Sequence, residues 1–324
     1  MRTMPACLAL AFAASAAVAQ TAPESKSAFR PTKPVTIVVP YSAGGGTDAV
    51  GRLFAKQLGE LWGQTVVVDN RTGGNGSIGS SVVARAAPDG HTLLLAVSSL
   101  VINPHMMAKL PYDTKTAFTP VTPLAYSVVV LVGSPTLKAA DMKSFVALAK
   151  KEPGVHTFAS SEPATRLTAE RIFDASGVKL THIPYKGASQ WMTDVMAGTV
   201  DVGVASITSA QPFMKDGRLK ILGVAGEQRQ AMLPAVATFK EQGIPGLEAH
   251  SWYGLFAAGG TPASVVNAIH ADVIKVLAMP EVKARLATYG ALPGGEAPDA
   301  FAKRFQHELV EYGELTRKLG IQPE

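Results

Sequence analysis

Short apolar runs and segments of helical periodicity alternate along most of the chain. Residues 35–39 form an unbroken β-branched run, which is typical of a buried parallel strand. Residues 47–61 then repeat apolar side chains at helical spacing, and Thr47 or Asp48 is a suitable N-cap. The Gly-rich residues 41–46 join the two. The pattern therefore predicts a strand, a tight turn and a helix.

The same unit recurs to the end of the chain. Further strands are predicted at residues 65–68, 92–97, 127–132, 155–159, 180–183, 200–204, 219–224 and 252–257. Further helices are predicted at residues 80–87, 141–151, 165–176, 188–197, 263–279, 281–289 and 298–319. Because strands alternate with helices, the fold class is predicted to be α/β, with doubly wound parallel sheets. We expect two lobes joined by two crossover segments, with lobe 1 formed by residues 35–127 and 228–324, and lobe 2 by residues 128–227.

The N-terminus has the layout of a cleavable export signal. Arg2 precedes an apolar run at residues 8–18, and an A-x-A pattern ends at Ala19. The run is too short to span a bilayer. We therefore expect residues 1–19 to be a signal peptide that is cleaved before Gln20, residues 20–34 to be a mobile leader, and the protein to be periplasmic.

Composition excludes several kinds of site. The only cysteine, Cys7, lies in the expected export signal, and the seven histidines show no metal-ligand spacing, so no metal site is expected. The net charge is +5, but the basic residues are scattered, which predicts no nucleic-acid surface. No cofactor motif is present, because the Gly-rich turn fits neither the phosphate-binding nor the dinucleotide-binding pattern.

The first Gly-rich turn is the strongest candidate for ligand binding. It follows a predicted strand and opens a helix, where free N–H groups and the helix dipole attract an anion. The candidate residues here are Tyr41, Ser42, Ala43, Gly44, Gly45, Thr47 and Asp48. A plain connecting turn that requires glycine is the alternative, and Asp48 alone is also explained as a helix cap.

Other candidates are polar residues near predicted strand ends and helix starts. Small hydroxyls there can bond a carboxylate, and an arginine can pair with one through two hydrogen bonds. These candidates are Ser98, Ser160, Ser161, Ser206, Tyr185, Lys186 and Arg166. A surface position is the alternative for both Lys186 and Arg166. The second Gly-rich turn, residues 70–79, either shapes the same cleft or merely connects two elements.

No local motif indicates catalysis. The chain lacks a nucleophile-elbow pattern, and we expect no enzymatic activity. A secreted hydrolase remains an alternative, and it requires Ser and His within hydrogen-bond reach in the cleft.

Seven segments in order resemble the extracytoplasmic solute receptors of the tripartite tricarboxylate transporter, also called Bug receptors. The segments are VPYSAGGGTD (residues 39–48), VVVDNRTGGNGSIG (66–79), PDGHTLLLA (88–96), LPYDTKTAFTPVTPLA (110–125), HIPYKGASQWMTDVMAGTVDVGVAS (182–206), KDGRLKILGVAGEQR (215–229) and SWYGLFAAGGTP (251–262). The resemblance covers nearly the whole mature chain. It implies a periplasmic binding protein with a Venus-flytrap fold, working as a monomer that captures a small carboxylate and delivers it to membrane transporter subunits. The ligand would be a dicarboxylate, an aromatic acid or a similar molecule, and a sensor that feeds a two-component system is the alternative role.

One loop departs from the family pattern. Residues 160–166 are about two residues short and lack the usual Gly-x-Gly-Ser stretch. In this loop Thr165 replaces the usual hydroxyl, and Arg166 stands where histidine is common. The resemblance implies that lobe 2 contributes three parts of the ligand site: this loop, the turn from Tyr185 to Gly187, and Ser206. We hypothesise that Arg166 binds the ligand carboxylate directly.

Overall fold

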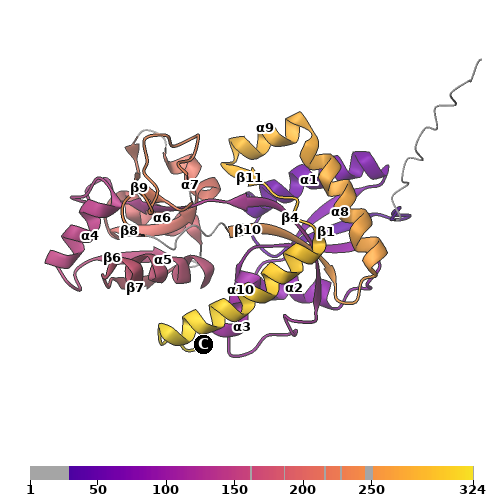
Figure 1. The fold of residues 1–324 in the computed structure, drawn as a ribbon, viewed down its shortest axis with the longest axis horizontal. Coiled ribbons are helices and arrows are strands. Elements are labelled where there is room, and N and C mark those ends of the chain that lie inside the picture. Colours follow the sequence, from indigo (N-terminus) through magenta and orange to yellow (C-terminus); the bar gives the residue numbers. More distant parts are fainter. Residues whose placement is uncertain are drawn as a thin grey trace, which may run out of the picture.

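The chain folds into two lobes, each built around its own sheet (Figure 1). The computed structural model describes residues 29–160, 163–185, 187–214, 217–226, 228–244 and 251–323. The expected export signal and most of the expected leader lie outside this part of the chain. The two-lobed α/β architecture that the sequence predicts is confirmed.

Lobe 1 contains a six-stranded sheet in the order β11-β4-β10-β3-β1-β2. Its strands are β1 (Val35–Val39), β2 (Val66–Asn70), β3 (Thr92–Ala96), β4 (Phe118–Ser127), β10 (Ser251–Ala258) and β11 (Ala291–Pro293). Strand β1 pairs in parallel with β2 and β3. Strand β10, however, is antiparallel to both β3 and β4. The prediction of a wholly parallel sheet is therefore wrong, because β10 enters lobe 1 from the crossover and runs back along β4.

Helices cover both faces of this sheet (Figure 1). They are α1 (Gly46–Trp62), α2 (Ser77–Ala84), α3 (Ser99–Met106), α8 (Ala263–Ala278), α9 (Pro280–Thr288) and α10 (Pro298–Lys318), with a short 3₁₀ turn, η1 (Gly74–Gly76). On one face Ile37 of β1 packs with residues of α1 and α8, such as Phe54. On the other face its neighbour Val38 packs with α10 residues such as Phe305. Burial on both faces explains why β1 is apolar throughout rather than alternating.

Lobe 2 contains a five-stranded sheet in the order β7-β6-β8-β5-β9. Its elements are β5 (Val129–Gly133), α4 (Met142–Lys151), β6 (Thr157–Ser160), α5 (Pro163–Ser176), β7 (Thr181–Pro184), α6 (Ala188–Ala197), β8 (Val202–Ser206), α7 (Ile207–Met214) and β9 (Lys220–Val224). Strand β6 pairs in parallel with β7 and β8, whereas β5 is antiparallel to β8 and β9. The lobe 1 sheet thus contains two reversed strands, β10 and the edge strand β11, which is antiparallel to β4, whereas β5 is the reversed strand of the lobe 2 sheet.

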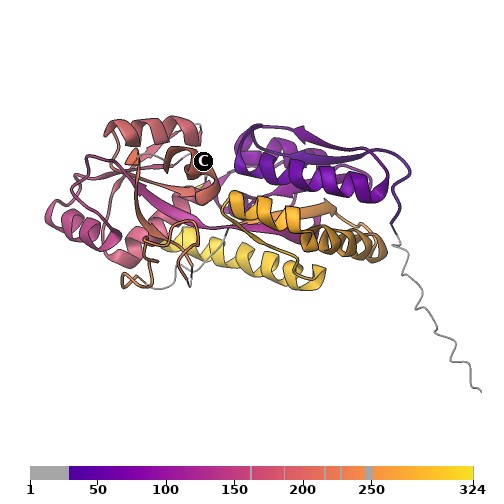
Figure 2. The same ribbon diagram turned by 90° about the horizontal axis from the view of Figure 1, so that it is seen from above.

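The chain passes between the lobes twice, but the second crossover comes later than the predicted boundary at residue 228, because Phe239 and Ile244 are buried in the core of lobe 2. Strand β4 ends at Ser127 and β5 begins at Val129, and the return path leads from β9 to β10. The terminal helix α10 belongs to lobe 1 but extends beneath lobe 2 (Figures 1 and 2). There Lys318 Nζ lies 3.0 Å from Asp174 Oδ2 on α5. Helices α10 and α5 therefore form a second contact between the lobes, away from the two crossovers.

No single helix in the described part of the chain is long and apolar enough to cross a membrane. Helices α8 and α9 meet the length and composition test only as a pair bent by 78°.

Candidate ligand-binding cleft

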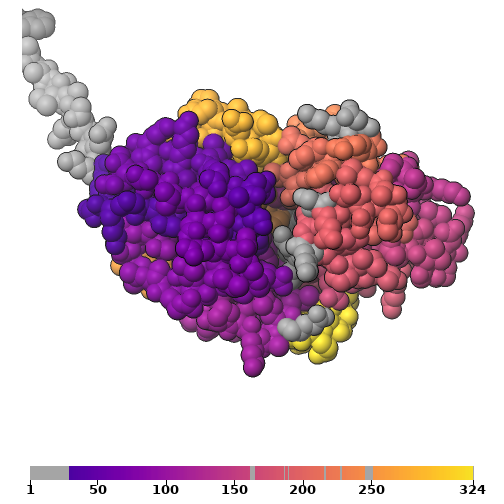
Figure 3. Space-filling model, turned by 180° about the vertical axis from the view of Figure 1, so that it is seen from behind, coloured from indigo at the N-terminus to yellow at the C-terminus, as the bar shows by residue number. Residues whose placement is uncertain are grey.

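A cavity of about 1160 Å³ lies between the two lobes, and Figure 3 shows the furrow that separates them. Lobe 1 contributes both Gly-rich turns, the start of α1 and residues at the ends of β3, β4 and β10. Lobe 2 contributes residues of β5, β8, α5, α6 and α7. Carboxyl ends of parallel strands and the start of a helix thus meet at one cleft, which is where open α/β sheets bind ligands.

The first Gly-rich turn brings the start of α1 into this cleft. Gly45 is the N-cap of α1, and no side chain caps the helix. A Cβ at Gly46 would lie 2.8 Å from the hydroxyl of Tyr253 in lobe 1 and 3.2 Å from Cγ2 of Thr208 in lobe 2. Only glycine allows this close approach between the lobes. The positive end of the α1 dipole therefore lies at a point where both lobes come together.

Asp48 holds this turn in place instead of lining the cleft. Its Oδ2 accepts hydrogen bonds from Gly44 N at 2.9 Å and from Arg52 Nε at 3.0 Å. Its Oδ1 accepts one from Asn70 Nδ2 at 3.1 Å. Burial opposes ionisation, but the hydrogen bonds from Arg52, Gly44 and Asn70 keep the pKa of Asp48 below its ordinary value. Asp48 thus supports the turn, and ligand contact by Asp48 stays a prediction.

The same contacts limit which backbone groups of the turn face a ligand. The Gly44 N–H donates to Asp48, and the Gly45 N–H donates to Ser42 O at 3.4 Å. Helix geometry leaves the backbone N–H groups of Gly46, Thr47 and Asp48 without an intrahelical partner, and of these residues Gly46 and Thr47 line the cleft.

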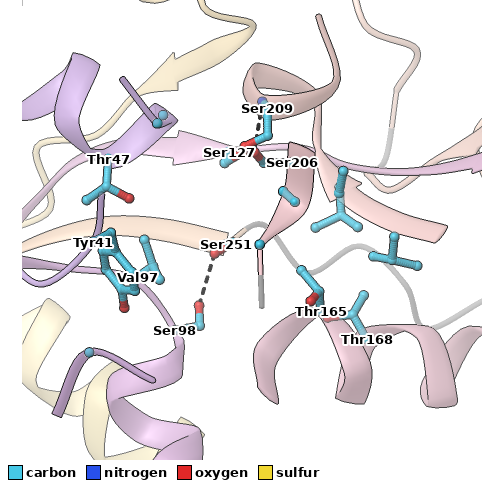
Figure 4. Close-up of a pocket in the computed structure, with 18 of the residues that line it drawn as sticks. Tyr41, Thr47, Val97, Ser98, Ser127, Thr165, Thr168, Ser206, Ser209 and Ser251 are labelled. Carbon is cyan, nitrogen blue, oxygen red and sulfur yellow. Dashed lines mark hydrogen bonds between the residues drawn. The ribbon is translucent and has the colours of Figure 1, made fainter. Parts of the chain in front are cut away.

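Hydroxyl groups from both lobes surround the cavity (Figure 4). They belong to Tyr41, Ser42, Thr47, Thr72, Ser98, Ser127, Thr165, Thr168, Tyr185, Ser206, Ser209, Ser251, Tyr253 and Tyr312. Ser98 Oγ and Ser251 Oγ are 3.3 Å apart, and Ser206 Oγ donates to Ser209 Oγ at 2.8 Å. Ser127 is 2% exposed, and its Oγ has no hydrogen-bond partner among the described residues. An unpaired buried hydroxyl in a cavity wall indicates a ligand or water that completes it.

The lobe 2 side of the cavity is mostly apolar. Buried side chains of Val129, Val204 and Phe239 line it, together with Ile172. Among the lining residues that the structure describes, Arg171 on α5 is the only charged one.

Most of the candidate residues predicted from sequence lie at this cavity. Those that line it are Tyr41, Ser42, Ala43, Gly44, Gly45, Thr47, Ser98, Thr165, Tyr185, Gly187 and Ser206. Asp48, Ser160 and Arg166 do not line it. Ser161 and Lys186 lie outside the described residues. Ligand contact by any of these residues stays a prediction.

Ser160 and Arg166 lie instead near His182, a half-buried residue of β7 at the edge of the lobe 2 sheet. Ser160 is 3% exposed, and its Oγ lies 2.8 Å from His182 Nε2. Burial, with the nearby charge of Arg166, lowers the pKa of His182 to about 4. Such an imidazole is neutral and a weak base at neutral pH. The Ser–His distance that a hydrolase requires is thus present, but the pair is not among the residues that line the cleft.

Several lining residues were not predicted from the sequence. They are Ser127, Thr168, Arg171, Ser209, Ser251, Tyr253 and Tyr312. The spacing of Thr165, Thr168 and Arg171 on one face of a helix was a usable signal. Ser127 and Ser251 had no local signal, because they meet only through the pairing of β4 with β10.

Comparisons with known proteins agree with this architecture. A family model described as the tripartite tricarboxylate transporter family receptor matches residues 50–321. A protein encoded in the tcbD-tcbE intergenic region of a Pseudomonas species is 37% identical over 288 residues, which cover 88% of this chain and 86% of the relative. Protein BugT of Bordetella pertussis is 30% identical over 313 residues, which cover 95% of each chain.

Solved structures show the same fold. A Rhodopseudomonas palustris protein solved with adipate has a TM-score of 0.84 and 30% identity, covering 91% of this chain and 99% of its own. Periplasmic binding protein BugD has a TM-score of 0.81 and 30% identity, covering 91% and 100%. MatC of Rhodopseudomonas palustris with bound malate has a TM-score of 0.77 and 29% identity, covering 88% and 99%.

Proposed function

The chain belongs to the tripartite tricarboxylate transporter receptor family, and on this premise we propose that it captures a small carboxylate in the cleft between its lobes. It then delivers the ligand to the membrane subunits of a tripartite transporter. In this proposal the protein works as a monomer in the periplasm, after cleavage of the export signal before Gln20.

The unpaired hydroxyl of Ser127 is the observation that carries the proposal. This buried group lines the cleft, and it lacks a hydrogen-bond partner in the described part of the chain. Leaving such a group unsatisfied costs about 1–3 kcal/mol, so a bound acceptor or water that pairs with it is favourable. The start of α1 adds N–H groups and a positive dipole end at the same cleft. Hydroxyls and uncapped N–H groups together suit a carboxylate.

The solved relatives support this class of ligand. One has adipate and another has malate, and both of these are small acids with two carboxylates. A ligand that touches both lobes stabilises the closed arrangement through its additional contacts there. The transporter would distinguish the loaded receptor by that arrangement.

A thermal-shift screen of residues 20–324 tests the proposal. The panel contains mono-, di- and tricarboxylates and aromatic acids, with the corresponding amides as uncharged controls. A ligand that binds only the folded state raises the melting temperature as its concentration exceeds the dissociation constant. We expect a dose-dependent rise for at least one acid and none for its amide. No rise for any acid, in a sample that is folded by circular dichroism, would contradict the receptor function.

Ser127→Ala tests the observation itself. The variant should lose roughly tenfold in affinity for the acid identified by the screen, which corresponds to one hydrogen bond of about 1.4 kcal/mol. Its melting temperature without ligand should equal or exceed that of the wild type, because an unsatisfied buried group is removed. Ser81→Ala is the matched control, since Ser81 is equally buried in lobe 1 but donates to Ile78 O and does not line the cleft. Equal losses in the two variants would mean that Ser127 does not contact the ligand.

A further inference from the structure

Arg171 is a charged group in an otherwise uncharged cleft wall. No other charged side chain lines the cleft within the part of the chain that the structure describes. The Arg171 side chain is 23% exposed, and its Nη1 lies 3.9 Å from Oε1 of Glu311 on α10. Tyr312, the next residue of α10, also lines the cleft. The cation therefore lies where α5 of lobe 2 meets α10 of lobe 1.

The position of Arg171 separates it from the hydroxyls that surround the start of α1. Thr165, Thr168 and Arg171 are spaced by three residues, so they share one face of α5. Six residues of helix rise correspond to about 9 Å from Thr165 to Arg171. Figure 4 shows Thr165 and Thr168 on α5, across the cleft from Tyr41 and Ser98. Arg171 continues this row one turn beyond Thr168, and a ligand group that meets it is a different group from one held near Thr165.

Apart from Arg171, the described residues of the lobe 2 wall are uncharged, with buried apolar side chains beside hydroxyl groups and the amide of Gln190. Val129, Val204 and Phe239 are buried apolar residues that line it, and Ile172 adjoins Arg171. A charged substituent pressed against these side chains would lose water without gaining a partner. The middle of a bound ligand is therefore expected to be uncharged.

We propose that Arg171 determines ligand specificity by binding a second anionic group, so that the preferred ligand is an acid with two anionic groups joined by an uncharged spacer. The inference rests on the proposed receptor function. A guanidinium has five N–H donors, which lets it approach Glu311 and bind a ligand carboxylate at the same time. The second anion would also bring Arg171 of lobe 2 and Tyr312 of lobe 1 to one ligand, and so favour closure.

Isothermal titration with matched pairs of acids tests this proposal. The probes are adipate with its monomethyl ester and terephthalate with its monomethyl ester, so that each pair differs in one negative charge. For the wild type we expect the diacid of at least one pair to bind ten times or more tighter than its monoester. In Arg171→Gln that ratio should fall to about one, through weaker binding of the diacid, while the monoester affinity is unchanged. Arg171→Lys should keep part of the ratio, since it retains the charge but not the paired donors.

Arg317→Gln is the matched control, because Arg317 lies on α10 and donates to Gly313 O without lining the cleft. This variant should keep the wild-type ratio. The proposal is overturned if wild type binds diacids and monoesters equally, or if Arg171→Gln weakens both alike. It is also overturned if Arg166→Gln or Lys186→Gln abolishes the preference for the diacid over its monoester while Arg171→Gln keeps that preference. Failure of the wild type to bind any acid of the wider screen would contradict the receptor function itself, which is a distinguishable result.

Discussion

Replacing Asp48 by alanine tests whether the first Gly-rich turn is held by a buried carboxylate. The side chain of Asp48 is 5% exposed and accepts hydrogen bonds from Gly44 N, Arg52 Nε and Asn70 Nδ2. A hydrogen bond to a charged group contributes about 1.5–3 kcal/mol, but the ion pair with Arg52 adds little because the Arg52 side chain is 56% exposed and screened by solvent. Asn70 keeps a second acceptor, Tyr41 O, at 3.0 Å. The largest part of the effect therefore comes from the Gly44 N–H, which loses its acceptor. We expect the free energy of unfolding to fall by roughly 2–4 kcal/mol in total.

Thermal and urea unfolding measure this loss. A change of this size lowers the melting temperature by about 4–16 °C in a chain of 150–250 residues, and by somewhat less in a longer one. Asp48→Asn keeps a neutral acceptor and should lose about half as much. Arg52→Ala removes only the exposed partner and should lower the melting temperature much less than Asp48→Ala does. Because the folded-state pKa of Asp48 is lowered, its contribution is present above the ordinary pKa of 3.8 and is lost as the pH falls through the lower value. A loss below about 0.5 kcal/mol in Asp48→Ala, or an equal loss in Arg52→Ala, would refute this reasoning.

Two further changes test other parts of the molecule. Gly46→Ala should lower ligand affinity tenfold or more with little change in unfolding temperature, because its methyl group would meet Thr208 of lobe 2 and hold the lobes apart; unchanged affinity in titration calorimetry would contradict this. Burial raises the pKa of Glu308 to about 7, although Trp252 Nε1 donates to it at 2.7 Å. Its neutral form therefore stabilises the fold fully below the ordinary value of 4.5, and this contribution is lost as the pH rises toward 7. Between pH 4.5 and 8, the free energy of unfolding of Glu308→Gln should accordingly rise by roughly 2–3 kcal/mol relative to that of the wild type. A difference that stays constant across urea titrations in this pH range would exclude the raised pKa of Glu308.

The alternation of strands and helices could be predicted from the sequence because burial acts locally on it. Strand β1 is covered on both faces and is therefore apolar throughout, and α1 repeats apolar residues on the face that packs against the sheet. Prolines concealed other elements. Helices α3 and α7 contain Pro104 and Pro212, and β4 contains Pro120 and Pro123, which a sequence pattern interprets as breaks. Strand β4 accommodates its prolines through irregular register with β10.

The direction of β10 depended on the tertiary structure. The sequence of residues 251–258 does not indicate whether the strand runs parallel or antiparallel to β3, because either direction buries the same side chains. The crossover decides it, since the chain re-enters lobe 1 beside the end of β4 and pairs Ser251 with Ser127.

The residues of the candidate site also fall into two groups, those that the sequence predicted and those that only the fold brings together. The turn around Gly44 to Thr47 was found from sequence, because glycines, a preceding strand and a following helix are consecutive along the chain. Sequence also favoured Asp48 and Arg166 as ligand residues, but the fold directs Asp48 to the turn and Arg166 to His182. Ser127, Arg171 and Tyr312 come from separate elements and meet only when two sheets and α10 are assembled. Local order along the chain thus determined where one binding turn forms, whereas the packing of the two lobes decided which distant polar groups face it.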